Sequence, residues 1–568
     1  MLEAYLKERN EHPLWLPVLR QELASSPEAV EVLFSLTTCD GQIVNRRQFL
    51  PKWRTPAERE LAREYLNACV FNMLSVFGGR ELRFFPVERE DSILSLLEGL
   101  EADFRSGGLA KCIRVSDRIN RSRGNAPFRF VPVGEAVPAF RAEVPAPRFS
   151  LSERLRETAA RAQGHCCCGV DIGGTDIKLA AARGERLVCV KEYDWNPSES
   201  ASAEGIIAPI LLLVRLMRVC LAAEGTALFS RLQDALRRDA PDEEIARAVA
   251  LAEAELGERA DVLDAVGVSF PDVVIRNKII GGETPKTKGM RDHAPDYEAE
   301  FSKLGALDER LLTLCRPGGR VRMANDGALA AYTAAMELSH SPSGSELDGG
   351  VLAHSLGTDL GSGLLSGDGT IPPLPLELYD CLLELGSVAK RRHPPRDLRS
   401  VCNENSGLPG VRRYLGQAAV FRMAWERDET LLEGFTAKDG DVLYVPDSRP
   451  DLRKPCLEHL MALAEAGEEN ARAVFYQIGV GLGQICREAE YLLESGTRTR
   501  YLFGRFAKRK SCFELICQGC RDTAPEFRLL AADSDMAFSP LMRALKERSD
   551  VTVAQFGQAV GSAYFAFS

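Results

Sequence analysis

Two glycine-rich segments, and one aspartate between them, contain the residues best suited to chemistry. The first segment, 169–180, follows an apolar run and holds Asp171, Gly173, Gly174 and Thr175. Adjacent glycines let backbone N–H groups approach an anion, a threonine adds a hydroxyl donor, and an aspartate can hold Mg²⁺ beside phosphate oxygens. An ordinary hairpin turn would use the same Gly-Gly pair. Taken alone, this segment leaves phosphate binding and a simple turn equally open.

The second segment, 355–365, repeats the pattern of the first. A turn with Gly357 and Thr358 is followed by a strand that contains Gly361 and Gly363. Neither segment has the spacing of a Walker A loop or of the dinucleotide-binding glycine motif. Two such hairpins, far apart in the chain, predict a duplicated fold whose halves close on one phosphate chain.

Asp326 lies between these hairpins, after the apolar run 321–324 and before an alanine-rich helix. An α/β sheet places its ligands at the carboxyl ends of its strands. A carboxylate there can accept the proton of an attacking hydroxyl group. The alternative is that Asp326 only caps the helix, a common task for aspartate. The position of Asp326 between two candidate phosphate-binding segments favours the role of general base over that of helix cap.

The elements that must position these residues follow an α/β pattern from Cys166 onward. Hydrophobic periodicity predicts strands near 167–172, 178–183, 187–192, 263–269, 320–324, 350–355, 362–366 and 499–503. It predicts two long helices in 200–260 and further helices at 327–338, 411–428, 453–465 and 468–495. Ser150 and Glu153 have the spacing of a capping box. We divide the chain into an N-terminal α+β extension (1–150), a lobe with the first hairpin (151–325) and a lobe with the second (326–568).

Composition narrows the class of protein. The chain has 568 residues and a formal net charge of −10, which argues against a nucleic-acid partner. No run reaches the ~18 apolar residues of a membrane span, and the N-terminus lacks the apolar core of a secretory signal. We therefore expect a cytoplasmic protein without a membrane partner, whose 16 cysteines are reduced. Cys517 and Cys520 form a CxxC pair without a second pair, so we expect no metal there.

Together these segments resemble the ROK family of sugar kinases and sugar-responsive regulators, over residues 166–568. The resemblance implies an α/β, two-lobed actin-like (ribonuclease H-like) sugar kinase fold, with an additional mostly helical N-terminal region. It implies ATP and Mg²⁺ as cofactors and a small sugar-like acceptor, and it allows a homodimer. Asn325-Asp326 resembles the strand-end Asn-Asp of the family, whose aspartate is the catalytic base.

The resemblance also assigns residues to binding roles. The nucleotide would contact Asp171, which would also hold Mg²⁺, together with Gly173, Gly174, Thr175, Lys178, Gly357, Thr358, Gly361, Gly363 and Gly504. The acceptor would contact Thr284, Lys286, Asn325, Asp326 and Glu377. Lys178 on an emerging strand, and Lys286 with Lys288 in a loop, are as readily explained as solvated side chains.

Three departures from the family pattern affect the acceptor side. The sugar-contacting asparagine expected after Pro271 is not evident, and residues 284–288 stand there instead. The histidine that follows the family's sugar-binding glutamate is replaced by Asp380. The cysteine-rich zinc loop is reduced to Cys402, so we expect no structural zinc. Phosphate handling is therefore expected to be retained and the acceptor to differ from the usual family sugars.

Three other functions stay open. A sugar-responsive regulator would need a helix-turn-helix in 1–150, where we find no compact one, and the basic stretch 114–129 is expected to be a solvated loop. A non-catalytic sugar- or nucleotide-binding protein would share the altered acceptor motifs. A related actin-like phosphotransferase could act on a polyol, a carboxylate or water.

Overall fold

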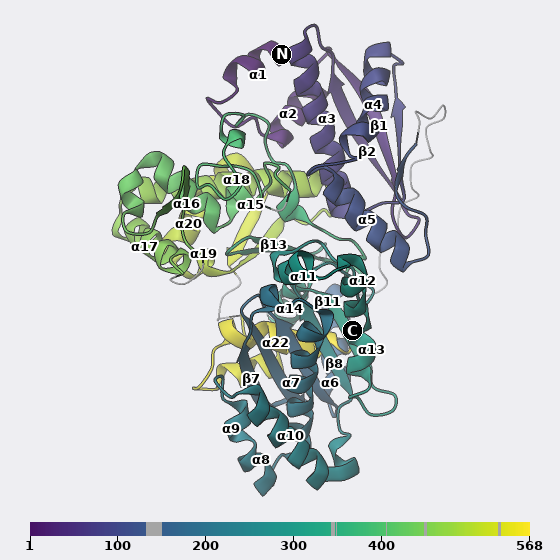
Figure 1. The fold of residues 1–568 in the computed structure, drawn as a ribbon, viewed down its shortest axis with the longest axis vertical. Coiled ribbons are helices and arrows are strands. Elements are labelled where there is room, and N and C mark those ends of the chain that lie inside the picture. The colour runs from purple at the N-terminus through teal and green to yellow at the C-terminus, as the bar shows by residue number, and fades with distance from the viewer. Residues whose placement is uncertain (132–149, 342–346, 348, 405, 448–450, 532–535) are drawn as a thin grey trace. The chain divides into compact units, whose positions relative to one another are not determined.

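A computed structural model, drawn as a ribbon in Figure 1, describes all residues except 132–149, 342–346, 348, 405, 448–450 and 532–535. The chain forms two compact units. The first unit comprises Met1–Pro145, Ser355–Ser362 and Leu374–Ala531; the second comprises Ala146–His354, Gly363–Pro373 and Ala532–Ser568. Both units are discontinuous in sequence, and the division into three consecutive segments stays a prediction.

A five-stranded mixed sheet forms the centre of the second unit. Its order is β11-β8-β5-β6-β7, from Arg320–Asn325 (β11), Ala265–Phe270 (β8), Cys166–Ile172 (β5), Asp176–Arg183 (β6) and Arg186–Asp194 (β7). Strands β5, β6 and β7 are antiparallel neighbours, whereas β8 and β11 run parallel to β5. The predicted α/β class is confirmed, and this strand order is the one expected of a ribonuclease H-like sheet.

Helices surround this sheet. The longer ones are α6 (Leu151–Ala162), α7 (Ala203–Ala223), α10 (Asp242–Leu256), α14 (Asp326–Ser339) and α22 (Val553–Phe565). The shorter ones are α8 (Ala227–Arg231), α9 (Gln233–Leu236), α11 (Lys288–His293), α12 (Tyr297–Ser302), α13 (Leu307–Leu312) and α21 (Pro540–Lys546). Short strands β9 (Val274–Ile275) and β10 (Lys278–Ile279) pair with each other. The predicted capping box of Ser150 and Glu153 is present at the start of α6.

Helix α7 differs from what the sequence analysis expected. Among the described residues, it is the one helix that is long and apolar enough to cross a membrane. It passes this test although it contains Arg215 and Arg218. Ile210, Leu213 and Met217 are fully buried in the hydrophobic core of the second unit. We therefore interpret α7 as the core helix of this unit.

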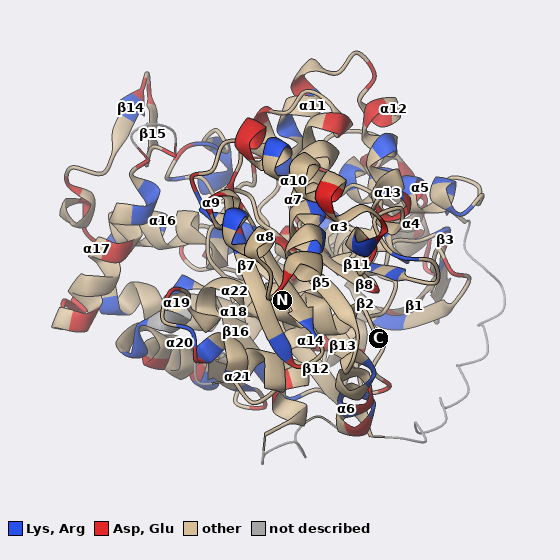
Figure 2. Ribbon diagram, turned by 90° about the horizontal axis from the view of Figure 1, so that it is seen from below, with Lys and Arg blue, Asp and Glu red and all other residues tan. Residues whose placement is uncertain are grey.

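The N-terminal part of the first unit is an α+β structure. Its sheet has the order β2-β1-β3-β4, from Ile43–Pro51, Ala29–Thr37, Glu81–Pro86 and Arg129–Phe130. Its helices are α1 (Leu2–Glu8), α2 (Leu16–Ala24), α3 (Pro56–Phe77), α4 (Asp91–Asp103) and α5 (Ala110–Ser122). The expectation of a solvated loop over 114–129 is wrong, because α5 occupies its first half and buries Arg118. Basic and acidic residues are interspersed along the helices (Figure 2).

A second sheet has the order β13-β12-β16-β17, from Leu360–Ser366, Gly350–Leu356, Thr499–Phe503 and Arg528–Ala531. This order corresponds to β6-β5-β8-β11 of the first sheet, as a duplicated fold predicts. The remaining helices are α15 (Arg412–Leu415), α16 (Gln417–Arg427), α17 (Arg453–Ala466), α18 (Glu469–Leu493), α19 (Arg505–Lys508) and α20 (Lys510–Thr523). A hairpin joins β14 (Ala437–Asp439) to β15 (Val442–Tyr444).

Two glycines let α22 lie directly on the sheet of the second unit. A Cβ atom at Gly169 of β5 would lie 1.8 Å from the carbonyl oxygen of Ala559. A Cβ atom at Gly267 of β8 would lie 1.8 Å from the carbonyl oxygen of Ser562. Since no side chain fits in this space, the helix backbone contacts the strands. This contact fixes the position of Gln558, which lies one residue before Ala559.

This packing makes Gly267→Ala a destabilising change. The added methyl group must push α22 away from β8, and overpacking of this kind costs about 1–3 kcal/mol or more. We expect the midpoint of thermal unfolding to fall, as measured by calorimetry. Gly305→Ala is the matched control, because its Cβ atom would have no neighbour within 4 Å. Equal midpoints for the two variants would show that α22 does not rest on β8.

Candidate functional site

The carboxyl ends of β5 and β8 hold a chain of hydrogen bonds that leads to Asp326. Asp171 lies opposite Ser269 in the register of the two strands. The Ser269 hydroxyl donates to the Asp171 carboxylate (Oγ to Oδ1, 3.0 Å). The Gln558 amide of α22 donates both to Ser269 Oγ (2.8 Å) and to the main-chain oxygen of Asp326 (2.9 Å). Helix α22 thus connects the two predicted functional aspartates.

Asp326 is the first residue of α14, but Asn325 caps the helix. The Gly327 N–H donates to Asn325 Oδ1 and to Asp326 Oδ1, each over 2.9 Å. Asn325 is held in turn, because its amide donates to the Asp272 carbonyl (3.0 Å). The other carboxylate oxygen of Asp326, Oδ2, lies 3.8 Å from Lys286 Nζ, and the side chain is 39% exposed. Asp326 therefore combines a fixed orientation with an accessible oxygen.

The first glycine turn lies next to this pair. The Gly173 N–H donates to the Asp176 carbonyl (2.8 Å), and the Trp195 indole N–H donates to the Gly173 carbonyl (3.1 Å). A Cβ atom at Gly174 would lie 3.5 Å from Cε of Lys286. Lys286 therefore lies between the glycine turn and Asp326. The Lys286 side chain is 34% exposed, and its role at the acceptor stays a prediction.

Two other predicted residues of the second unit have clear surroundings. Lys178 forms an ion pair with Asp176, so its role with phosphate stays a prediction. Thr284 is buried, and its hydroxyl oxygen has no hydrogen-bond partner among the described residues. Thr284 lines a cavity of about 10 Å³ together with Trp195 and Lys286. This volume has room for about one water molecule, so in this conformation the cavity holds no sugar.

The electrostatics of the site centre on Asp171. The pKa of its carboxyl group is raised to about 6: burial raises it most, the charges of Asp326 and Asp176 add to the shift, and Lys178 and the Ser269 hydrogen bond oppose it. Among the described residues, no group of three or more His, Cys, Asp or Glu side chains could hold a metal. Mg²⁺ in phosphoryl-transfer sites takes one or two carboxylates plus phosphate oxygens and water. Asp171, as a single carboxylate at a strand end, fits a Mg²⁺ that arrives with a nucleotide.

The second glycine turn belongs to the first unit. The Gln417 N–H at the start of α16 donates to the carbonyls of Gly357 (3.1 Å) and Thr358 (3.3 Å). Gly504 has φ +96°, and a Cβ atom there would lie 2.1 Å from the Leu356 carbonyl oxygen. The turn after β16 therefore contacts the end of β12, next to the predicted phosphate hairpin. A Cβ atom at Gly361 would have one neighbour, at 3.5 Å.

Two predicted site residues, Gly363 and Glu377, lie outside the two glycine turns. A Cβ atom at Gly363, in the second unit, would lie 1.8 Å from the Gly327 carbonyl oxygen, so close packing against α14 explains this glycine. Glu377, in the first unit, is buried, and its N–H donates to the Ser75 carbonyl (3.0 Å). Its contact with the N-terminal region was not predicted.

Sequence reasoning missed three residues of the second-unit site: Trp195, Ser269 and Gln558. Ser269 ends a predicted strand, so its element was found without its role, and Gln558 lies in α22. Only the register of β5 against β8 shows that Ser269 faces Asp171. Trp195 follows β7, and no motif marks it.

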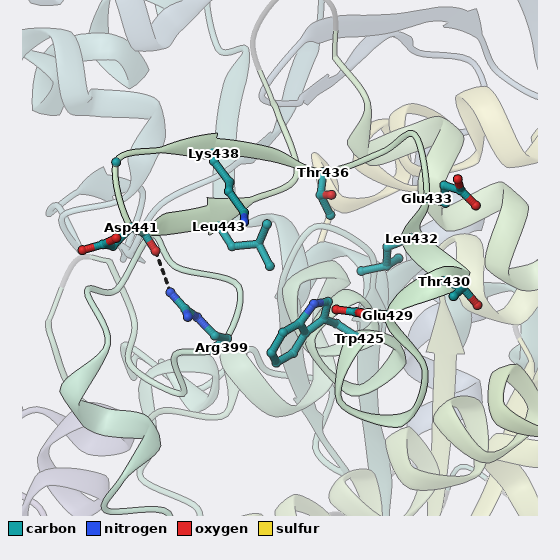
Figure 3. Close-up of a pocket in the computed structure, with 11 residues that line it drawn as sticks. Arg399, Trp425, Glu429, Thr430, Leu432, Glu433, Thr436, Lys438, Asp441 and Leu443 are labelled. Atoms are coloured by element: carbon teal, nitrogen blue, oxygen red, sulfur yellow. Dashed lines mark hydrogen bonds between the residues drawn. The ribbon is translucent and has the colours of Figure 1, made fainter.

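A larger cavity of about 610 Å³ lies in the first unit, between the β14–β15 hairpin and the end of α16 (Figure 3). Trp425 and Lys438 lie on opposite sides of it in Figure 3, and Arg399 donates to the Asp441 carbonyl (2.7 Å). None of the predicted site residues lines it. No sequence pattern marks this cavity.

Of the comparisons with known proteins, the one with solved structures found similar proteins. No model of a known protein family matches the sequence, and no curated protein sequence matches it. A ROK family glucokinase from Streptomyces griseus, solved with glucose and AMPPNP, is 18% identical over 71% of this chain and 99% of its own, with a TM-score of 0.39. A glucokinase from Balamuthia mandrillaris is 13% identical (69% and 98% covered, TM-score 0.40).

A ROK family transcriptional regulator, a homologue of the E. coli MLC protein, is 14% identical over 71% of this chain and 82% of its own, with a TM-score of 0.39. The solved structures that the chain resembles thus include both ROK sugar kinases and a ROK regulator. Because these TM-scores lie below 0.5, we draw no functional conclusion from them.

The two aspartates should be electrostatically coupled. The charge of Asp326 contributes to the raised pKa of Asp171, so Asp326→Asn should lower that pKa from about 6 toward the ordinary range of aspartate. The carboxyl titration can be followed by infrared difference spectroscopy against Asp171→Asn. Asp261→Asn, a change at an exposed residue elsewhere in the second unit, should leave the pKa of Asp171 unchanged. An unchanged Asp171 pKa in Asp326→Asn would show that the two carboxylates are not electrostatically coupled.

Proposed function

We propose that the protein is an ATP-dependent kinase that transfers a phosphoryl group to a hydroxyl of a small sugar-like acceptor, with Asp326 as the general base. One observation supports this most directly. Asp326 has one carboxylate oxygen fixed by the Gly327 N–H and the other exposed beside Lys286, next to the Gly173–Gly174 turn. A helix cap alone would need neither the lysine nor the glycine turn.

In the proposed reaction, Asp326 accepts the proton of the acceptor hydroxyl while the hydroxyl oxygen attacks the terminal phosphorus of ATP. The new bond joins this oxygen to phosphorus, and the bond to the oxygen of ADP breaks. Lys286 compensates negative charge that develops on the transferred group. The Gly174 N–H and the Thr175 hydroxyl bind phosphate oxygens, while the Gly173 N–H, which donates to the Asp176 carbonyl, holds the turn in place. Bound Mg²⁺, beside Asp171, would neutralise phosphate charge.

Residues of the first unit complete the proposal. Gly357, Thr358 and Gly361 are the proposed second set of phosphate contacts, and Gly504 would border the adenine. On the acceptor side we propose Thr284, Lys286, Asn325 and Glu377. The free hydroxyl of buried Thr284 supports a polar ligand near it. A cytoplasmic location and a homodimer stay predictions.

Asp326→Asn should abolish most phosphoryl transfer and leave nucleotide binding intact. Loss of a general base typically lowers the rate ~10²–10⁴-fold. Product formation from radiolabelled ATP would be measured over a panel of sugars and polyols, and ADP binding by calorimetry. Asp261→Asn, which changes the same residue type elsewhere in the unit, should retain full activity.

Three results would separate the alternatives. Wild-type rates in Asp326→Asn would contradict the assignment of the base. Nucleotide and sugar binding by the wild type without any turnover would favour a non-catalytic binding protein. Salt-dependent DNA binding would favour a regulator.

A further inference from the structure

The second glycine turn carries an acidic residue. Asp359 lies between Thr358 and the strand β13, which begins at Leu360, and its side chain is 32% exposed. A carboxylate in this position repels the phosphate groups of a nucleotide, because like charges at close range destabilise each other. A turn that binds phosphate therefore needs a positive charge beside Asp359.

Arg412 of α15 supplies this positive charge. Its Nε–H donates to Asp359 Oδ1, and the two side chains form an ion pair. Both residues belong to the first unit. The Arg412 side chain is 13% exposed, so protein covers most of it. The pair thus cancels the charge of Asp359 at the place where phosphate is proposed to bind.

Backbone contacts hold the segment that carries Arg412 against the same turn. The Gln417 N–H donates to the carbonyls of Gly357 and Thr358, and the Gly416 N–H donates to the Arg412 carbonyl (3.2 Å). A Cβ atom at Gly416 would lie 2.6 Å from the Thr358 carbonyl oxygen, so no side chain fits between the two segments. The main chain, as well as the ion pair, therefore fixes the guanidinium beside the turn.

The Arg412 guanidinium has hydrogen-bond donors left over. It carries five N–H groups, and the ion pair with Asp359 uses the one on Nε. Among the described residues, Nη1 and Nη2 of Arg412 have no hydrogen-bond partner, and neither nitrogen is one of the fully buried polar atoms that lack a partner. Both nitrogens therefore reach solvent. Arginine–carboxylate pairs are frequently bidentate, whereas this one leaves the two terminal nitrogens available.

We infer that Arg412 is a further nucleotide-binding residue, whose two terminal nitrogens bind a phosphate group at the second glycine turn. The planar fork of a guanidinium matches two oxygens of one phosphate group. Asp359 accepts from Nε and so fixes the plane of that fork. This inference rests on the proposed function for the presence of a nucleotide at this turn, and it does not require phosphoryl transfer.

A double-mutant cycle on Arg412 and Asp359 tests for direct contact with phosphate. Arg412→Met should weaken binding of ADP ~10- to 100-fold, as loss of a hydrogen bond to a charged group predicts. The same loss should appear when Arg412→Met is made in an Asp359→Asn background, where Arg412 has no carboxylate to neutralise. Binding of adenosine, which lacks phosphate, should be unchanged. The measurement is isothermal titration calorimetry on the full chain.

Further variants separate phosphate binding from an effect on folding. Because water reaches Asp359, Arg412→Met should lower the thermal midpoint only slightly. Arg412→Lys keeps the positive charge without the planar fork, so it should also bind ADP more weakly than the wild type, and it replaces Arg412→Met if that variant does not fold. Arg487→Met breaks an ion pair with Glu526 elsewhere in the first unit and should leave ADP binding unchanged.

Each outcome decides the inference. Folded Arg412 variants that keep wild-type affinity for ADP overturn it, even if the wild type transfers phosphate. A loss of affinity that disappears in the Asp359→Asn background also overturns it, because Arg412 would then act only by neutralising Asp359. A wild type that does not bind ADP overturns it as well. ADP binding that depends on Arg412 in both backgrounds, in a protein without phosphoryl transfer, supports the inference and contradicts the proposed kinase.

Discussion

The site of the second unit depends on how closely α22 packs against β5 and β8. Because Gly169 and Gly267 lack side chains, the helix backbone contacts the strands directly. At this distance the Gln558 amide reaches both Ser269 and the main chain of Asp326. If α22 were displaced by a side chain at either glycine, these two hydrogen bonds would lengthen together, and the ends of β5 and β11 would lose their common support. A packing constraint in the core thus becomes a positional constraint on two carboxylates.

The two glycine hairpins share a local sequence pattern, but different contacts hold their turns in place. In the second unit, Trp195 holds the turn through the Gly173 carbonyl, and Lys286 lies against Gly174. In the first unit, the Gln417 N–H holds the carbonyls of Gly357 and Thr358. The strand orders of the two sheets correspond, while these contacts differ. The duplication therefore repeats the strands and the turn, and each unit supplies its own side chains around them.

The sequence predicted what local patterns determine and missed what long-range contacts determine. Periodicity located β5, β8 and β11, and turn chemistry located both hairpins, since these features depend on neighbouring residues. Asn325 was expected to assist at the acceptor, and the structure shows that it caps α14 by accepting from the Gly327 N–H. The stretch 114–129 was expected to be a loop, because its many arginines make the apolar face of α5 hard to recognise in the sequence. Lys111 and Asp380, 269 residues apart, meet only through the tertiary structure.

The N-terminal region is joined to the rest of the first unit by buried charge as well as by backbone bonds. Arg20 donates to both carboxylate oxygens of Glu488 on α18 (2.6 and 3.0 Å), and Asn72 donates to one of them (2.8 Å). Glu488 is fully buried, so it needs these donors. The Asn72 side chain also donates to the Leu382 carbonyl and accepts from the Leu382 N–H. One amide therefore links α18 to the segment that carries Glu377 and Asp380, and separation of the N-terminal region would expose a carboxylate and release that segment together.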